Sequence, residues 1–288
     1  MIHRRKSMHS TGYLNDDGMI RRHRYFEFDV NNTRVISGLF STLPGQEISV
    51  DWGDGSRSTY SGVDQAWSHD YGSAGDYVMR IFGSVALTKF QMTESGADVS
   101  FDLADLPSGL TYFSCWGSNT VSGDIANLPS GLTYFDIHGD NTVSGDIANL
   151  PSGLTYFDCV GDNTVSGDIA NLPSGLTFFR CRGSNTVFGD IANLPSGLTY
   201  FDCYGNNVIA GYSGKTWTTK PAKFHFIPVS PGGLSTAEVD QLLIDFDDDL
   251  TWASGNVILL TGANAARSSD SDAAVANMVA EGATVTTH

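Results

Sequence analysis

The sequence predicts a mainly β protein in which a parallel β solenoid follows a smaller β module and precedes an α/β capping region. Three observations support this fold class. The pentapeptide LPSGL recurs with a strict period of 22 residues, beginning at residues 106, 128, 150, 172 and 194. The stretch before these repeats alternates apolar and polar residues, as β-strands do. The stretch after them alternates strand-like and helix-like patterns.

These patterns divide the chain into four segments. Residues 1–24 form a basic leader, 25–84 the first β module, 85–214 the solenoid and 215–288 the capping region. No segment holds eighteen consecutive apolar residues, so membrane insertion is not expected. The first residues also lack the apolar stretch of a secretory signal.

The leader and the rest of the chain carry opposite charges. The leader has six Lys and Arg against two Asp, whereas residues 25–288 have 10 basic and 30 acidic side chains. A body this acidic repels phosphate groups, so a nucleic-acid partner is not expected. The leader is expected either to anchor the chain to a virion or to another copy of itself, or to be a solvated tail.

The first β module carries a recognisable motif. Its segments YFEFDV, EISVDWGDGS and DYVMRIFG are expected to be strands. The turn W-G-D-G at 52–55, the pair His69 and Tyr71, and the run from Gly75 to Tyr77 and Val78 resemble the PKD family of immunoglobulin-like β-sandwiches. This resemblance implies a spacer or adhesion module and not an enzyme.

The repeat unit reads L-P-S-G-L-T-Y-F-x-C-x-G-x-N-T-V-x-G-D-I-A-N. A coil of this length buries its apolar face only by stacking on its neighbours. Alternation directs Phe113 and Cys115 into the core, and Asn119 with its equivalents is expected to form an inward ladder that satisfies backbone groups. Over residues 87–214 the pattern resembles the leucine-rich repeat, with one extra residue between the Cys and Asn positions.

The four cysteines share one position of the repeat, where Ile137 stands in the second copy. A position that accepts Ile is expected to be apolar and buried, so the sequence predicts reduced structural thiols and neither a bridge nor a metal site. No cofactor is expected. The runs WGDGS and DFDDD lack the Lys of a phosphate loop and the Gly and distal Glu of an EF-hand loop, respectively.

The capping region is expected to contain three strands and two helices. Its strands are FHFIPV, NVILLTG and ATVTT, and its helices are LSTAEVDQLLIDFDDDL and DSDAAVANMVAEG. A capping box from Ser235 to Glu238 begins the first helix. We expect this region to close the end of the solenoid, since an open parallel edge recruits other chains.

Variation between the copies is concentrated on the outward side of one strand, and we expect this surface to bind a ligand. Exposed positions elsewhere, such as Asp124 and Thr111, hardly vary between copies, which argues against free drift. The candidate ligand-binding residues are Tyr112, Ser114, Trp116, Tyr134, Asp136, His138, Tyr156, Asp158, Val160, Phe178, Arg180, Arg182, Tyr200, Asp202 and Tyr204.

These features predict a non-enzymatic recognition protein that binds a bacterial surface protein or glycan through the concave face of the repeats. A phage tail-tip or fibre protein fits best, because such proteins leave the cell by lysis and need no signal. A bacterial surface adhesin and a filament-forming structural subunit are the alternatives. A polysaccharide depolymerase that uses Asp136 and Asp158, with His138 beside them, is a fourth possibility.

Overall fold

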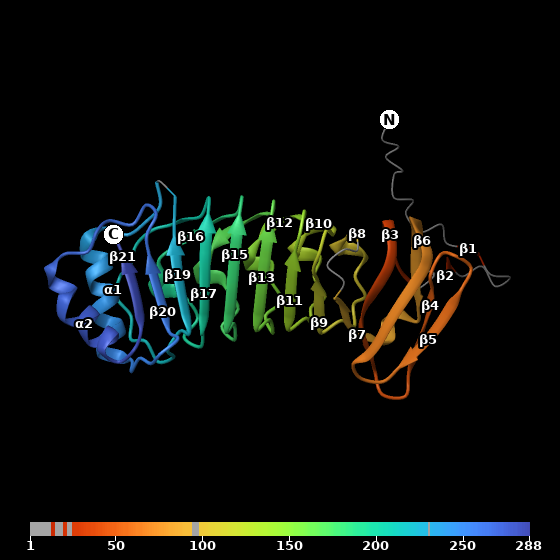
Figure 1. Ribbon diagram of the computed structural model, residues 1–288, viewed down its shortest axis with the longest axis horizontal. Coiled ribbons are helices and arrows are strands. Elements are labelled where there is room, and N and C mark those ends of the chain that lie inside the picture. Colours follow the sequence, from red (N-terminus) through yellow and green to blue (C-terminus); the bar gives the residue numbers. More distant parts are fainter. Residues whose placement is uncertain (1–12, 15–19, 22–24, 94–97, 230) are drawn as a thin grey trace.

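The computed structural model describes residues 13–14, 20–21, 25–93, 98–229 and 231–288. Apart from a pair of short strands, β1 (Tyr13–Leu14) and β2 (Ile20–Arg21), every strand among these residues belongs to one hydrogen-bonded network. Antiparallel strands form its N-terminal end, parallel strands fill its middle and two α-helices lie at its C-terminal end (Figure 1). The predicted mainly β fold with a repetitive parallel sheet is confirmed, whereas most of the basic leader lies outside the described residues.

Four strands form the antiparallel region ahead of the repeats: β3 (Tyr25–Thr42), β4 (Glu47–Asp51), β5 (Arg57–Ser61) and β6 (Gln65–Phe82). Strand β3 pairs along its length with β6, and β4 lies between β5 and β6. Alternate residues of these strands, among them Phe26, Phe28 and Trp67, are buried in a common core. The alternation seen in the sequence therefore correctly identified this core.

The residues of the W-G-D-G and H-x-Y motifs pack against one another. The Trp52 ring stacks on His69 with centroids 4.6 Å apart, and His69 Nε2 lies 2.8 Å from Asp54 Oδ2. The hydroxyl of Tyr71 donates to the carbonyl of Trp52 over 3.1 Å. These contacts give the motif a structural role in shaping the turn after β4.

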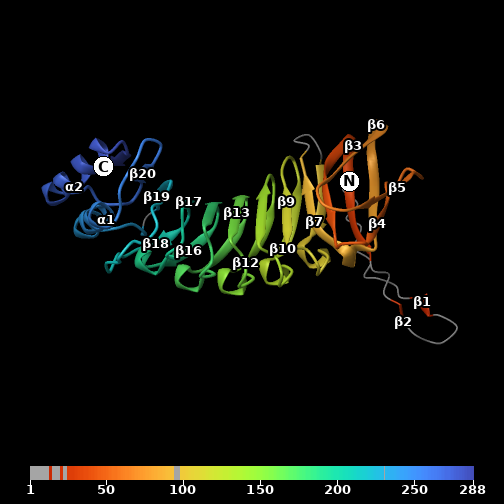
Figure 2. The same cartoon turned by 90° about the horizontal axis from the view of Figure 1, so that it is seen from below.

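Each repeat forms one coil with two strands and a short 3₁₀ helix. The first strands of successive coils pair in parallel and form what we call the first ladder: β7 (Leu87–Met92), β9 (Tyr112–Cys115), β11 (Tyr134–His138), β13 (Tyr156–Gly161), β15 (Phe178–Gly183) and β17 (Tyr200–Gly205). The second strands form the second ladder: β8 (Asp98–Asp102), β10 (Thr120–Asp124), β12 (Thr142–Asp146), β14 (Thr164–Asp168), β16 (Thr186–Gly189) and β18 (Val208–Ile209). The array bends gently, with the first ladder on its concave side (Figure 2).

Strand β3 covers the N-terminal end of both ladders. Its residues 38–42 pair antiparallel with β7, and its residues 29–31 pair antiparallel with β8. An irregularity in its pairing with β6 separates these two stretches, between Val30 and Val35. The antiparallel region is therefore joined to the solenoid by backbone hydrogen bonds, which removes the open edge at that end.

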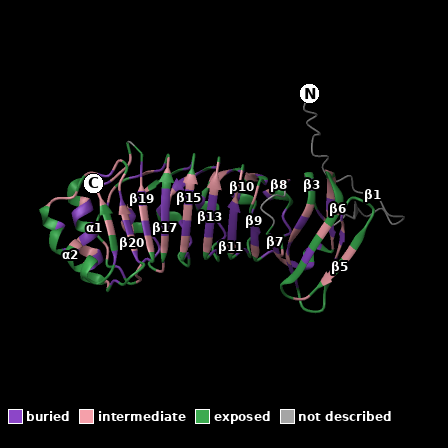
Figure 3. Ribbon diagram, in the orientation of Figure 1, coloured by how far each residue is buried: buried purple, intermediate pink, exposed green. Residues whose placement is uncertain are grey.

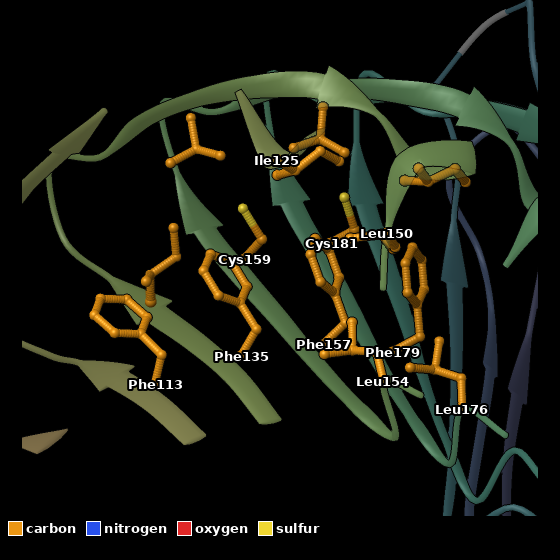
Figure 4. Close-up of a cluster of buried hydrophobic side chains, with 14 of the residues drawn as sticks. Phe113, Ile125, Phe135, Leu150, Leu154, Phe157, Cys159, Leu176, Phe179 and Cys181 are labelled. Atoms are coloured by element: carbon orange, nitrogen blue, oxygen red, sulfur yellow. The ribbon is translucent and has the colours of Figure 1, made fainter. Parts of the chain in front are cut away.

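The core of the solenoid repeats from coil to coil. The rings of Phe113, Phe135, Phe157 and Phe179 form a row inside it, beside the thiols of Cys159 and Cys181 (Figure 4). All four cysteines are free and fully buried, as predicted. Burial raises the pKa of the Cys159 thiol well above its usual range, because the apolar core cannot solvate a thiolate. Buried, half-buried and exposed residues follow one another along the strands (Figure 3). They alternate in β15, whereas the three central residues of β11 are all buried.

The predicted asparagine ladder is confirmed in four of the five copies, whereas the buried side chain of Asn119 has no hydrogen-bond partner among the described residues. In each of four coils the Oδ1 of a fully buried Asn accepts the backbone N–H of a Val in the preceding coil, as Asn163 does from Val143 over 2.9 Å. The glycine at the end of the first strand is also required: at Gly183 φ is +111°, and a Cβ would lie 2.0 Å from the carbonyl oxygen of Gly161 in the preceding coil.

The C-terminal region continues the first ladder. Strands β19 (Lys223–Ile227), β20 (Val257–Leu260) and β21 (Thr284–Thr287) extend it in parallel, and α1 (Thr236–Asp249) and α2 (Asp272–Ala280) connect them. All five elements predicted here are present, including the capping box of Ser235 and Glu238. None of the described helices is long and apolar enough to cross a bilayer.

Candidate functional site

The structure brings all fifteen candidate residues together on the outward side of the first ladder. Because the strands pair in register, the candidates form three rows that cross five strands. The aromatic row is Tyr112, Tyr134, Tyr156, Phe178 and Tyr200. The charged row is Ser114, Asp136, Asp158, Arg180 and Asp202. The third row is Trp116, His138, Val160, Arg182 and Tyr204.

The aromatic row is a continuous stack. Neighbouring ring centroids lie 4.0–4.1 Å apart and the ring planes are within 15° of parallel. At one end the Lys89 ammonium lies 4.5 Å from the centroid of Tyr112, and at the other the Lys223 ammonium lies 5.2 Å from the centroid of Tyr200. Each ring is half-buried by its neighbours, so the row forms a rigid platform.

The charged row is not exposed, and the sequence-based expectation was wrong on this point. Ser114 is 2% exposed, and Asp136, Asp158 and Asp202 are 0% exposed. These side chains do point away from the core, but they are short and lie between the aromatic row and the longer side chains of the third row. The hydroxyl of Tyr134, for example, donates to Asp136 Oδ2 over 3.1 Å.

Arginines from the fourth copy neutralise two of these buried carboxylates. Arg180 forms a bidentate pair with Asp158, in which Nε donates to Oδ1 over 2.7 Å and Nη2 donates to Oδ2. Arg182 forms the same kind of pair with Asp202, with Nε 3.0 Å from Oδ1. A buried carboxylate without a partner is strongly destabilising. The need to neutralise buried charge therefore accounts for Arg180 and Arg182, without reference to a ligand.

The same pairing explains the one phenylalanine in the aromatic row. Tyr134 and Tyr156 each direct their hydroxyl toward the Asp two residues later in the same strand. In the fourth copy Arg180 replaces that Asp. Because the guanidinium only donates hydrogen bonds, a tyrosine hydroxyl would have no acceptor there, and the ring at this position is Phe178. The two changes are physically linked.

His138 lies at the centre of the charged residues. Its Nε2 is 3.3 Å from Asp136 Oδ1, 3.2 Å from Asp158 Oδ2 and 2.7 Å from Arg180 Nη2. The nearby carboxylates of Asp136 and then of Asp158 raise the pKa of His138 to about 9, although burial and Arg180 oppose this shift. Two carboxyl groups, a guanidinium and the imidazole therefore share one small, mostly buried volume.

The third row contains the exposed part of the candidate surface. Trp116 is 48% exposed and Tyr204 is 52% exposed, and they occupy the same position in the first and fifth copies. Trp116 also stacks on the His138 ring, with centroids 5.1 Å apart. Val160, between the two rings, is half-buried.

The exposed positions that do not vary are constrained by structure. Asp124 accepts the backbone N–H of Ala126 and caps the 3₁₀ helix of its coil, and its equivalents in the next three coils do the same. The Thr133 hydroxyl donates to the Thr111 carbonyl of the coil below, and this bond also recurs. The constancy of these positions therefore lends no support to ligand binding at the variable ones.

Sequence reasoning missed two residues that extend the rows. Lys223 pairs in register with Tyr200, and His225 with Asp202. Lys223 Nζ lies 3.4 Å from Asp202 Oδ2 and donates to the Tyr200 hydroxyl over 3.0 Å. The available signal was the spacing of Phe224 and Phe226, which matches that of Phe201 and Cys203 although the surrounding letters no longer repeat.

The acidic end of α1 has structural partners, in keeping with the expectation that it is a helix end. Asp245 accepts from the Tyr212 hydroxyl over 2.5 Å, and Asp249 accepts from the backbone N–H of Trp217 over 2.7 Å. These carboxylates tie the helix to the segment that follows the last repeat.

Neither the models of known protein families nor the curated proteins provide a match to this chain.

Proposed function

We propose that the protein is a non-enzymatic recognition module that binds a surface molecule of another cell through the exposed rings of the third row. The observation that carries this proposal is the exposure of Trp116 and Tyr204, 48% and 52%, on a surface whose charged residues are paired with one another. Four strand spacings separate the two rings, which corresponds to about 19 Å. Aromatic side chains of this kind dominate the energy of many interfaces.

The surface between the two rings favours binding because it is rigid. The stacked aromatic row and the arginine–carboxylate pairs hold the side chains in fixed positions before any ligand arrives. Binding of a partner therefore costs little free energy for ordering the side chains of this surface. Flat rings separated by polar side chains suit either a glycan or a protein surface.

The cellular setting belongs to the same proposal. The likeness of the repeats to leucine-rich repeats, and of the first module to a PKD sandwich, favours a surface-recognition protein. A phage tail-tip or fibre protein that binds a bacterial receptor, with residues 1–24 as its anchor, is our first choice. A bacterial adhesin and a self-assembling subunit are the other settings.

The burial of the carboxylates favours a binding role over a hydrolytic one. A retaining glycosidase needs two carboxyl groups that reach the substrate. Asp136 and Asp158 are both 0% exposed, and Arg180 already binds both oxygens of Asp158. A sugar could contact neither group unless the charged row opened.

The experiment compares Trp116→Ala and Tyr204→Ala with Phe188→Ala. Phe188 is 45% exposed but lies on the second ladder, so it provides an aromatic control of similar exposure outside the three rows. Labelled protein is applied to a glycan array and to a panel of bacterial isolates. Trp116→Ala and Tyr204→Ala should each weaken binding by about 1–3 kcal/mol, with melting temperatures unchanged, and Phe188→Ala should bind as the parent does.

Two results would contradict the proposal. If Trp116→Ala and Tyr204→Ala bind like the parent while deletion of residues 1–24 abolishes attachment, recognition does not occur on the solenoid. If Phe188→Ala alone loses binding, the second ladder is the binding surface. Concentration-dependent sedimentation of the parent protein would identify the self-assembling alternative.

A further inference from the structure

The strongest unexplained feature outside the proposed binding rings is the cluster of Asp136, His138 and Asp158. A carboxylate oxygen of Asp136, a ring nitrogen of His138 and a carboxylate oxygen of Asp158 all lie within 4.8 Å of one another. Asp136 is fully buried, and its Oδ1, which faces His138, has no hydrogen-bond partner among the described residues. A buried carboxylate oxygen without a partner is costly and calls for a specific explanation.

With both carboxylates ionised, neither protonation state of His138 satisfies all the polar atoms of this cluster. If His138 is cationic, its Nε2–H and the Nη2 donor of Arg180 face each other across 2.7 Å. If His138 is neutral with Nε2 as an acceptor for Arg180, Asp136 Oδ1 faces a ring nitrogen that has no proton to donate, 3.3 Å away. The protein atoms alone therefore leave either a contact between two donors or an unpartnered carboxylate oxygen.

We propose that Asp136 Oδ1, His138 Nε2 and Asp158 Oδ2 form a binding site for a first-row divalent metal ion such as Zn²⁺. A tetrahedral zinc ion, about 2.0–2.1 Å from its ligands, holds them about 3.4 Å apart. The distances from Nε2 to the two carboxylate oxygens, 3.3 and 3.2 Å, are close to this separation. The imidazole ligand favours this class of metal over Ca²⁺ or Mg²⁺, which prefer oxygen ligands alone.

Arg180 determines when the metal can enter. Its Nη2 is bonded to Asp158 Oδ2 and lies beside His138, so the guanidinium must rotate to admit the ion. The bond from Nε to Asp158 Oδ1, 2.7 Å, can remain while Nη2 leaves, and it would then orient a metal ligand from the second coordination shell. The site stands on this geometry and does not depend on the proposed recognition function.

The test is a calorimetric titration of chelator-stripped protein with ZnCl₂, together with Co²⁺ absorption spectra. The parent should bind one ion per chain, with a spectrum free of thiolate charge-transfer bands, because the four cysteines lie in the core. His138→Gln should weaken binding by more than about tenfold, the loss that even an outer-shell partner can cause. Arg180→Gln should bind more tightly than the parent, because a competing cation is gone.

The matched control is His225→Gln. His225 faces a single buried carboxylate, with Nδ1 3.8 Å from Asp202 Oδ2, so its replacement should leave the affinity unchanged. The proposal is overturned if the parent shows no stoichiometric binding, or if His138→Gln binds as tightly as the parent. If Arg180→Gln binds zinc and the parent does not, the proposal is also overturned for the natural chain. The Arg180 guanidinium would then be the permanent partner of these carboxylates.

Discussion

The asparagine ladder allows one hydrogen bond to be measured against an almost perfect internal control. Asn163 and Asn119 occupy the same position of the repeat and are both 0% exposed. Asn163 Oδ1 accepts the N–H of Val143 over 2.9 Å, whereas neither polar atom of the Asn119 side chain has a partner among the described residues. Val99 stands to Asn119 as Val143 stands to Asn163. Val99 pairs with Val30 of β3.

The two alanine variants should therefore differ in stability. Asn163→Ala leaves a buried N–H unpartnered, at a cost of about 1–3 kcal/mol. Asn119→Ala creates a cavity of the same size but removes two polar atoms that were already unpartnered. We expect the free energy of unfolding to fall by about 1–3 kcal/mol more for Asn163→Ala than for Asn119→Ala.

Urea denaturation of both variants measures this difference, and amide exchange locates it. In Asn163→Ala the Val143 amide should lose protection while amides in distant coils keep theirs. Equal losses of stability within about 0.5 kcal/mol, or unchanged protection at Val143, would show that the ladder bond does not hold the coils together.

Two further predictions follow from the buried groups. A thiol reagent should label Cys159 only after denaturant is added, even at alkaline pH, and fast labelling of the native protein would contradict the packing. Cys159→Ile should lower the free energy of unfolding by less than about 1.5 kcal/mol, because Ile137 already fills the same position. The pKa of His138 is raised from 6.5 to about 9, so protonation of this side chain stabilises the folded, metal-free protein. This contribution to the free energy of unfolding should be present in full below pH 6.5 and should be lost as the pH rises through 9. The loss should be on the order of 2 kcal/mol, after allowance for partial exposure. A parent and a His138→Gln variant with parallel stability curves over this range would refute the assignment.

The sequence predicted which residues share a row, but not how deeply each row is buried. A strict period places Asp136 next to Asp158, and alternation directs both away from the core. Neither pattern shows that Tyr134, His138 and Arg180 are long enough to cover them. The depth of a short side chain depends on the height of its neighbours, and alternation along one strand contains no information about height.

Other features could have been inferred by comparing the copies more closely. The fourth copy changes the Tyr to Phe178 and the Asp to Arg180 together, and this double change indicates the hydroxyl–carboxylate contact found in the second and third copies. The continuation of the ladder into β19 was harder to see, because only the spacing of Phe224 and Phe226 survives. Loss of letter identity there concealed the preserved pattern of inward-facing rings.

The equivalence of the coil interfaces has a consequence for how such a chain can change its length. Each coil joins the next through the same register, so gain or loss of one copy by unequal recombination would preserve both ends and alter the array by about 4.8 Å. The charged row restricts which copies are dispensable. Deletion of the copy that carries Arg180 and Arg182 would place Asp158 directly beside Asp202, two buried carboxylates without their arginines. Length variants of this array are therefore expected to keep the fourth copy.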